Sequence, residues 1–367
     1  MDFFGITEDY RDHQFRYIEL FDKIYSSGKL YDGIYTEELE DKFAYYCGSR
    51  YAVAVGSGSD ALMMVLKFLG FNEFVEEVLI PNYTYVATME SVYRAGATPI
   101  PGEVYESGPE KYMLDCGIIR RNYRVMVYVP LFGLSGNMDK VVNYCGLTDM
   151  LLIEDCAQSI GTLWDGKHVG TFGVAGTFSF DPTKVLASPD GGGMVITNNE
   201  VLARHVRKMR YHGLGNHGMA TMTGMNSRMS EIGAAIISYK MDFLNTTLAL
   251  RTSIANRYTN CLGQIPQVKC PEISLKLTPS WSKYVIEVPK EERTSLINFL
   301  EGKGIPTKIH YERTPFSVYA GDVELMKKYP SYKLTQTSLS LPIHPYLAKN
   351  DFQAVDQVCN AIGDFFK

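Results

Sequence analysis

Short, almost wholly apolar runs alternate with helix-like segments along the first 240 residues. Of all the features of the sequence, this alternation limits the possible folds most strongly. The runs are "YAVAV", "EEVLIP", "RVMVYVP", "MLLIED", "VAGTFSF" and "GGMVIT". Strands that are apolar on both faces are typical of parallel sheets covered by helices on either side. The first 240 residues therefore predict a large α/β domain with a mostly parallel sheet, preceded by an N-terminal helical segment.

The pattern changes near residue 240. Residues 230–262 predict one long helix or a pair of helices, and the strand-like "SWSKYVIEVP" and a closing helix in "DFQAVDQVCNAIGDFF" follow. We predict two domains, a large α/β domain of residues 1–240 and a smaller α+β domain of residues 241–367.

Charge and composition exclude several classes of partner. The 36 basic residues against 41 acidic ones give a net charge of −5 without any basic run, which argues against nucleic acid. No apolar run is long enough to span a membrane, and "MDFFGITEDYRDHQ" lacks the pattern of a signal peptide. The seven cysteines lack metal-ligand spacing, so we expect free thiols, no metal and a cytoplasmic protein.

The segment "GSGSDAL" (residues 56–62) joins the first strand to a helix. Its small residues allow close approach of a ligand, and the helix N-terminus with the Ser59 hydroxyl favours a phosphate. A plain turn capped by a serine is the alternative.

Three further features follow strands of the same sheet: the tyrosines Tyr83 and Tyr85, the acid Asp155, and Lys184 between an apolar run and a triple glycine. Each alone has a structural explanation, such as a lid on the core, a salt bridge or a surface turn. Ligands of open α/β sheets gather at the carboxyl ends of the strands, so these features are expected to meet. Together they supply what pyridoxal 5'-phosphate (PLP) needs: a phosphate cradle, an aromatic face, a carboxylate for the pyridine nitrogen and a Schiff-base lysine.

The motifs "SGSDAL", "PNYTYVAT", "EDCAQSIG", "FSFDPTK" and "GMNSRMSEIGAA" occur in an order that resembles the DegT/StrS family of PLP-dependent sugar aminotransferases. The resemblance runs from about residue 26 to residue 347. It implies the aspartate-aminotransferase fold (fold type I) and a homodimer with active sites shared between the subunits.

The resemblance also implies roles for individual residues. Lys184 would form the Schiff base and move the proton, and Asp155 would pair with the pyridine nitrogen. The other cofactor-binding residues would be Gly58, Ser59, Tyr85, Gln158, Ser179 and, toward the neighbouring subunit's cofactor, Asn226. The substrate-binding residues would be Arg228, His310 and Tyr311. Apart from the resemblance, Tyr31 could offer a flat face and a hydroxyl to the sugar or the nucleotide base. Local capping remains open for Gln158, Ser179, Asn226 and Arg228, and a structural role remains open for His310 and the tyrosines.

The implied activity is transfer of an amino group, with glutamate as the donor by family resemblance, to a keto group of a nucleotide-linked deoxysugar. The sequence leaves open carbon 3 or carbon 4, the nucleotide and the sugar. One alternative is another fold type I PLP enzyme such as a sugar dehydratase, a branch in which histidine replaces the lysine. The other is a catalytically silent regulatory protein of the same fold. A nicotinamide-dependent dehydrogenase is disfavoured because "GSGSDAL" lacks the third glycine of its fingerprint.

Overall fold

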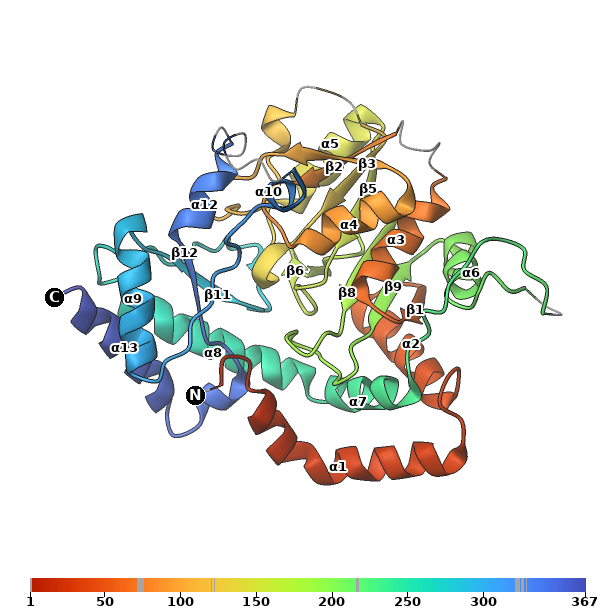
Figure 1. Ribbon diagram of the computed structural model, residues 1–367, viewed down its shortest axis with the longest axis horizontal. Helices are drawn as coiled ribbons and strands as arrows, with labels where there is room; N and C mark the ends of the chain where they lie inside the picture. The colour runs from red at the N-terminus through yellow and green to blue at the C-terminus, as the bar shows by residue number, and fades with distance from the viewer. Residues whose placement is uncertain are drawn as a thin grey trace.

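The computed structural model describes residues 2–70, 76–119, 121, 123–215, 218–320, 324, 327 and 329–367. Its centre is a seven-stranded sheet of order β1-β9-β8-β5-β4-β2-β3 (Figure 1). The strands are β1 (Tyr51–Val55), β2 (Glu77–Pro81), β3 (Thr98–Gly102), β4 (Val125–Tyr128), β5 (Leu151–Asp155), β8 (Ala175–Ser179) and β9 (Gly193–Thr197). Only the pairings of β9 with β1 and β8 are antiparallel, which confirms the predicted mostly parallel sheet.

Helices cover both faces of this sheet, as the apolar strands require. In β1, Val53 and Val55 belong to one core cluster, whereas Ala52 and Ala54 belong to a second. Successive side chains of a strand point to opposite faces, so the two clusters are the two layers between sheet and helices. The helices of this part are α1 (Ile6–Ser27), α2 (Ile34–Cys47), α3 (Gly58–Phe68), α4 (Val86–Ala95), α5 (Met138–Thr148), α6 (Glu200–Met209) and α7 (Glu231–Met241).

The helical stretch predicted over residues 230–262 is a pair, because α7 ends at Met241 and α8 (Leu244–Leu262) begins after a short break. Beyond it, β11 (Tyr284–Glu287) and β12 (Ser338–Leu341) form an antiparallel ribbon. The accompanying helices are α9 (Lys290–Gly302), α10 (Pro315–Ala320), α12 (Ser331–Thr337) and α13 (Gln353–Phe365). This mixture matches the expected α+β texture, while the domain boundary at residues 240/241 remains a prediction.

Short elements complete the chain. A small sheet joins β10 (Leu277–Thr278), β6 (Leu163–Trp164) and β7 (Lys167–His168). The short 3-10 helices are η1 (Cys116–Ile118), η2 (Leu131–Gly133) and η4 (Pro345–Ala348). Among the described residues, no helix combines the length and the apolar character needed to cross a membrane.

Candidate active site

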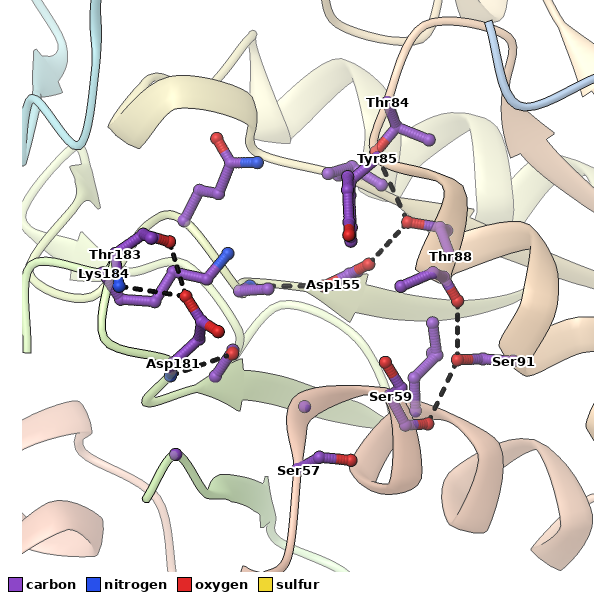
Figure 2. Close-up of a pocket in the computed structure, with 18 of the residues that line it drawn as sticks. Ser57, Ser59, Thr84, Tyr85, Thr88, Ser91, Asp155, Asp181, Thr183 and Lys184 are labelled. Atoms are coloured by element: carbon purple, nitrogen blue, oxygen red, sulfur yellow. Dashed lines mark hydrogen bonds between the residues drawn. The ribbon is translucent and has the colours of Figure 1, made fainter. Parts of the chain in front are cut away.

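A cavity of about 600 Å³ opens at the carboxyl ends of the central strands (Figure 2). Its walls come from residues 56–59 after β1, residues 84–91 after β2, the end of β5 and residues 179–184 after β8. Residues of the C-terminal part, among them Lys283 and Tyr311, close it from the other side. The four features that the sequence analysis singled out therefore do meet in one place.

Asp155 ends β5 and is 9% exposed. One carboxylate oxygen accepts a hydrogen bond of 2.8 Å from the Thr88 hydroxyl, and the other accepts one of 3.2 Å from the Ala157 N–H. Burial raises the pKa of Asp155, whereas these bonds and the charge of Lys184 lower it. No ion pair to Asp155 exists in the described part of the chain, so this buried carboxylate is suited to a cationic ligand.

A tight turn directly after β8 places Lys184. The Asp181 carboxylate accepts a 2.9 Å bond from the Thr183 N–H, and the Asp181 carbonyl accepts a 2.9 Å bond from the Lys184 N–H. Asp favours such turns because its side chain binds the backbone two residues on. The Lys184 side chain then extends into the cavity towards Asp155 (Figure 2). Burial lowers the pKa of Lys184, although Asp181 and Asp155 oppose the shift, and a lowered pKa favours a neutral amine.

The first turn of α3 faces the same cavity. Ser57 rather than Ser59 is the N-cap, and its hydroxyl accepts a 3.1 Å bond from the Asp60 N–H. Gly58 packs so closely on β8 that an added Cβ would lie 2.7 Å from Cβ of Ser179. Ser59 and Ser179 line the cavity beside this helix end. The helix N-terminus and the serine hydroxyls form a cradle suited to an anion such as phosphate.

Gln158 is fixed in one orientation by two contacts. Its Oε1 accepts a 3.2 Å bond from the Phe132 N–H, and its Nε2 donates a 2.6 Å bond to the Tyr311 hydroxyl. The amide nitrogen carries a second hydrogen, which leaves a donor for a ligand.

The two tyrosines of "PNYTYVAT" have different positions. Tyr85 is 53% exposed and lines the cavity, whereas Tyr83 is buried. The Tyr83 hydroxyl donates a 2.6 Å bond to the His310 carbonyl and accepts a 3.0 Å bond from the Tyr311 N–H. Tyr83 thus ties the C-terminal part to the large sheet, and Tyr85 offers an open aromatic face.

His310 also lines the cavity, with Nδ1 2.7 Å from the Ser340 hydroxyl. Burial lowers the pKa of His310 to about 3, assisted by the neighbouring lysines 283, 308 and 184. The imidazole is therefore neutral near pH 7.

Three of the predicted residues do not line the cavity of their own chain. Arg228 forms an ion pair with Asp32 at 2.9 Å, and its guanidinium lies over the rings of Tyr31 and Tyr211. Asn226 is exposed, and its backbone forms an isolated antiparallel β-bridge with Tyr211. The structure thus groups Tyr31, Asn226 and Arg228 with one another rather than with Lys184.

Thr88 and Lys283 are among the cavity residues that the sequence did not reveal. Thr88 lies three residues after Tyr85, one helical turn further along α4, so the helical spacing could have signalled it. Lys283 is a lysine before an apolar strand, and no local pattern distinguishes it from a surface charge.

The chain is similar in sequence and structure to proteins of one known family. A model of the DegT/DnrJ/EryC1/StrS aminotransferase family matches residues 12–362. The chain belongs to this family. The lysine, the acid and the helix end that meet in the cavity lie inside the matched range.

Two curated relatives show the range of names in the family. The chain is 31% identical over 333 residues to a dTDP-3-amino-3,4,6-trideoxy-alpha-D-glucose transaminase of Streptomyces venezuelae, covering 89% of this chain and 86% of the relative. It is also 31% identical over 346 residues to the erythromycin biosynthesis sensory transduction protein EryC1 of Saccharopolyspora erythraea, covering 92% and 91%.

Among solved structures, DesV of S. venezuelae in complex with a ketimine intermediate superposes with a TM-score of 0.93 at 28% identity, covering 100% of this chain and 98% of DesV. The fold is therefore that of the family's aminotransferases, as the resemblance implied.

Proposed function

We propose that this aminotransferase uses PLP to transfer an amino group from glutamate to a keto group of a nucleotide-linked deoxysugar. One observation carries the proposal: a single cavity brings together the amine of Lys184, the buried carboxylate of Asp155 and the first turn of α3. An amine, an unpaired acid and an anion cradle are the three fixed points that the cofactor requires.

The residues present fit the cofactor. Asp155 forms no ion pair with any described residue, and a protonated pyridine nitrogen would supply that partner. Gly58, Ser59 and Ser179 would hold the phosphate, Gln158 would donate to the ring hydroxyl, and Tyr85 would cover the ring. Lys184 would hold the aldehyde carbon through its amine. When bound, PLP acts as an electron sink for the carbon that loses a proton.

The side chains then have distinct tasks. Lys184, whose pKa burial lowers, takes the proton from the carbon that bears the donor's amino group and returns a proton later. Asp155, whose carboxylate accepts a hydrogen bond from Thr88, would keep a positive charge at the far end of the cavity. Tyr311 and Gln158 hold each other in place through their hydrogen bond.

Relatives support the substrate class. The Streptomyces transaminase is named for a dTDP-linked 3-amino sugar, which favours carbon 3 over carbon 4 as the aminated position. Glutamate as the donor rests on the family resemblance alone.

We further propose a homodimer with shared active sites. Asn226 is exposed and lies outside its own chain's cavity, as a residue that serves a neighbouring cofactor phosphate must. Large apolar side chains are exposed along α1, including Phe15 at 83% and Tyr25 at 61%. Exposed apolar surface of this kind marks an interface.

The experiment is a product assay with dTDP-linked 3-keto and 4-keto deoxysugars and glutamate. The proposal predicts an amino sugar and an equal amount of 2-oxoglutarate. Loss of water from the sugar without 2-oxoglutarate would instead indicate the dehydratase activity. Absence of any turnover, together with a protein that purifies without PLP absorbance, would favour the regulatory function that the name of EryC1 suggests for that relative.

A further inference from the structure

Lys283, just before β11, contributes a second buried lysine to the active-site cavity. It is 6% exposed, and it lines the same space as Lys184. Its Nζ donates a 3.2 Å bond to the carbonyl of Thr183 and lies 4.8 Å from the centre of the Phe4 ring. Thr183 immediately precedes Lys184, so Lys283 is held beside the backbone of the residue that carries the reactive amine.

No carboxylate within the described ranges forms an ion pair with Lys283. Burial lowers the pKa of Lys283 well below its usual range, and the cations Lys184, Arg251 and Lys308 lower it further, while Asp181 acts in the opposite direction. A buried ammonium among other cations is costly unless an anion joins it. A carboxylate that entered the cavity would supply the missing negative charge and favour the ammonium form.

Two other cations of this region, Arg251 and Lys308, differ from Lys283 in their partners or in their exposure. Arg251 is buried, and its guanidinium donates to the carbonyls of Trp281 and Ile343 at 3.0 and 2.9 Å. Lys308 also lines the cavity, but its side chain is exposed to solvent and its ammonium lies over the ring of Phe4. In the part of the chain that the structure describes, the Lys283 ammonium contacts one carbonyl and one ring, although an ammonium carries three donors.

We propose that Lys283 binds a carboxylate of the amino donor. The inference deepens the proposed function and depends on it. The α-carboxylate of any amino-acid donor is attached to the carbon that Lys184 must deprotonate, so its binding group has to lie beside Lys184. The bond between Lys283 and the Thr183 carbonyl places an unpaired cation there.

The test compares wild type, Lys283→Met and Lys283→Arg as holoenzymes. Methionine keeps the length and apolar stem of lysine, which suits a buried site. Each protein is titrated with glutamate, glutamine and isoglutamine, and binding is followed by absorbance. Glutamine lacks the side-chain carboxylate of glutamate, and isoglutamine lacks its α-carboxylate. Lys276→Met is the matched control, because Lys276 is an exposed lysine paired with Asp139 and Asp165 on the surface.

In wild type, the amide that lacks the carboxylate bound by Lys283 should bind at least tenfold more weakly than glutamate. In Lys283→Met, glutamate should bind at least tenfold more weakly, and one of the two amides should bind as well as glutamate does. Lys283→Arg should recover part of the affinity, and KM for the keto-sugar should stay within threefold in every variant.

If Lys283→Met still binds glutamate more tightly than both amides by the wild-type factors, the inference is overturned. It is also overturned if the variant has a higher KM for the keto-sugar and an unchanged affinity for glutamate. Borohydride reduction separates these outcomes from failure of the proposed function. A variant that still carries the reduced adduct on Lys184 has a competent site, whereas absence of the adduct in wild type would refute the proposed function itself.

Discussion

The Thr88 hydroxyl donates a 2.8 Å hydrogen bond to the carboxylate of Asp155 from a helix that begins after a different strand. This bond lowers the pKa of Asp155 against the burial that raises it. Hydrogen bonds to charged groups contribute about 1.5–3 kcal/mol. Thr88 is therefore a positioning residue that helps to keep Asp155 ionised.

Replacing Thr88 by valine removes this donor and raises the pKa of Asp155 further. Under the proposed function, catalysis needs the ionised acid. As the pH is lowered, activity should therefore begin to fall at a higher pH in the variant than in wild type. We expect the acid limb of kcat against pH to move up by about one unit. Thr88→Ser should restore the wild-type profile, and an unmoved acid limb in Thr88→Val would contradict this role.

Asp155→Asn keeps the shape of the acid and removes its charge. We expect kcat to fall by about 10³-fold or more, since the charge at the far end of the cavity is lost. Retention of activity within tenfold of wild type would show that the charge is dispensable.

The same variant makes a stability prediction with a fixed sign. The folded-state pKa of Asp155 lies above its unfolded value, so the folded protein binds more protons there and ionisation costs stability as pH rises. Without cofactor, Asp155→Asn at pH 8 should therefore unfold at a temperature no lower than wild type. A clearly lower unfolding temperature would mean that the carboxylate stabilises the empty site.

Gly58→Ala tests the packing of the phosphate cradle. The added Cβ would lie 2.7 Å from Cβ of Ser179 and 3.2 Å from the Phe178 carbonyl, so the first turn of α3 must shift. We expect PLP affinity, measured by absorbance titration, to fall at least tenfold. Gly146→Ala is the control, because that Cβ meets no atom within 4 Å inside α5 and should stabilise the fold by about 0.5–1 kcal/mol. Equal PLP affinity in both variants would disprove the cradle.

Subunit complementation tests the shared active site. Lys184→Ala and Asn226→Asp should each be nearly inactive, the second because its new charge repels phosphate. If Asn226 serves the neighbouring site, a mixed dimer has one site with both defects and one intact site. Refolding the two variants together should restore activity, and a mixture as inactive as its components would contradict a shared site.

The sheet was predictable because strands buried on both faces are mainly apolar, as "VMVY" in β4 and the first three residues of "LLIED" in β5 are. The strand β3 was missed, since "TPIPG" carries two prolines that only an edge strand tolerates. The break between α7 and α8 was left open because apolar and polar residues continue across it without a proline or glycine.

The core of the site was predictable for a different reason. Parallel strands end at one edge, so polar residues at strand ends, such as Asp155 and Lys184, were bound to meet. The position of Lys283 in the cavity depends instead on how the C-terminal part packs against the sheet. Its hydrogen-bond partner Thr183 lies 100 residues away in sequence. The position of Asn226 outside its own cavity likewise follows from tertiary structure, which no local motif encodes.

The central claim is that Lys184 holds the cofactor. The direct measurement is borohydride reduction of the purified protein followed by proteolysis and mass spectrometry of the peptides. The account predicts a pyridoxyl group on Lys184 and on no other lysine, with Lys283 unmodified. A pyridoxyl group on another lysine, or none in protein saturated with PLP, would contradict it.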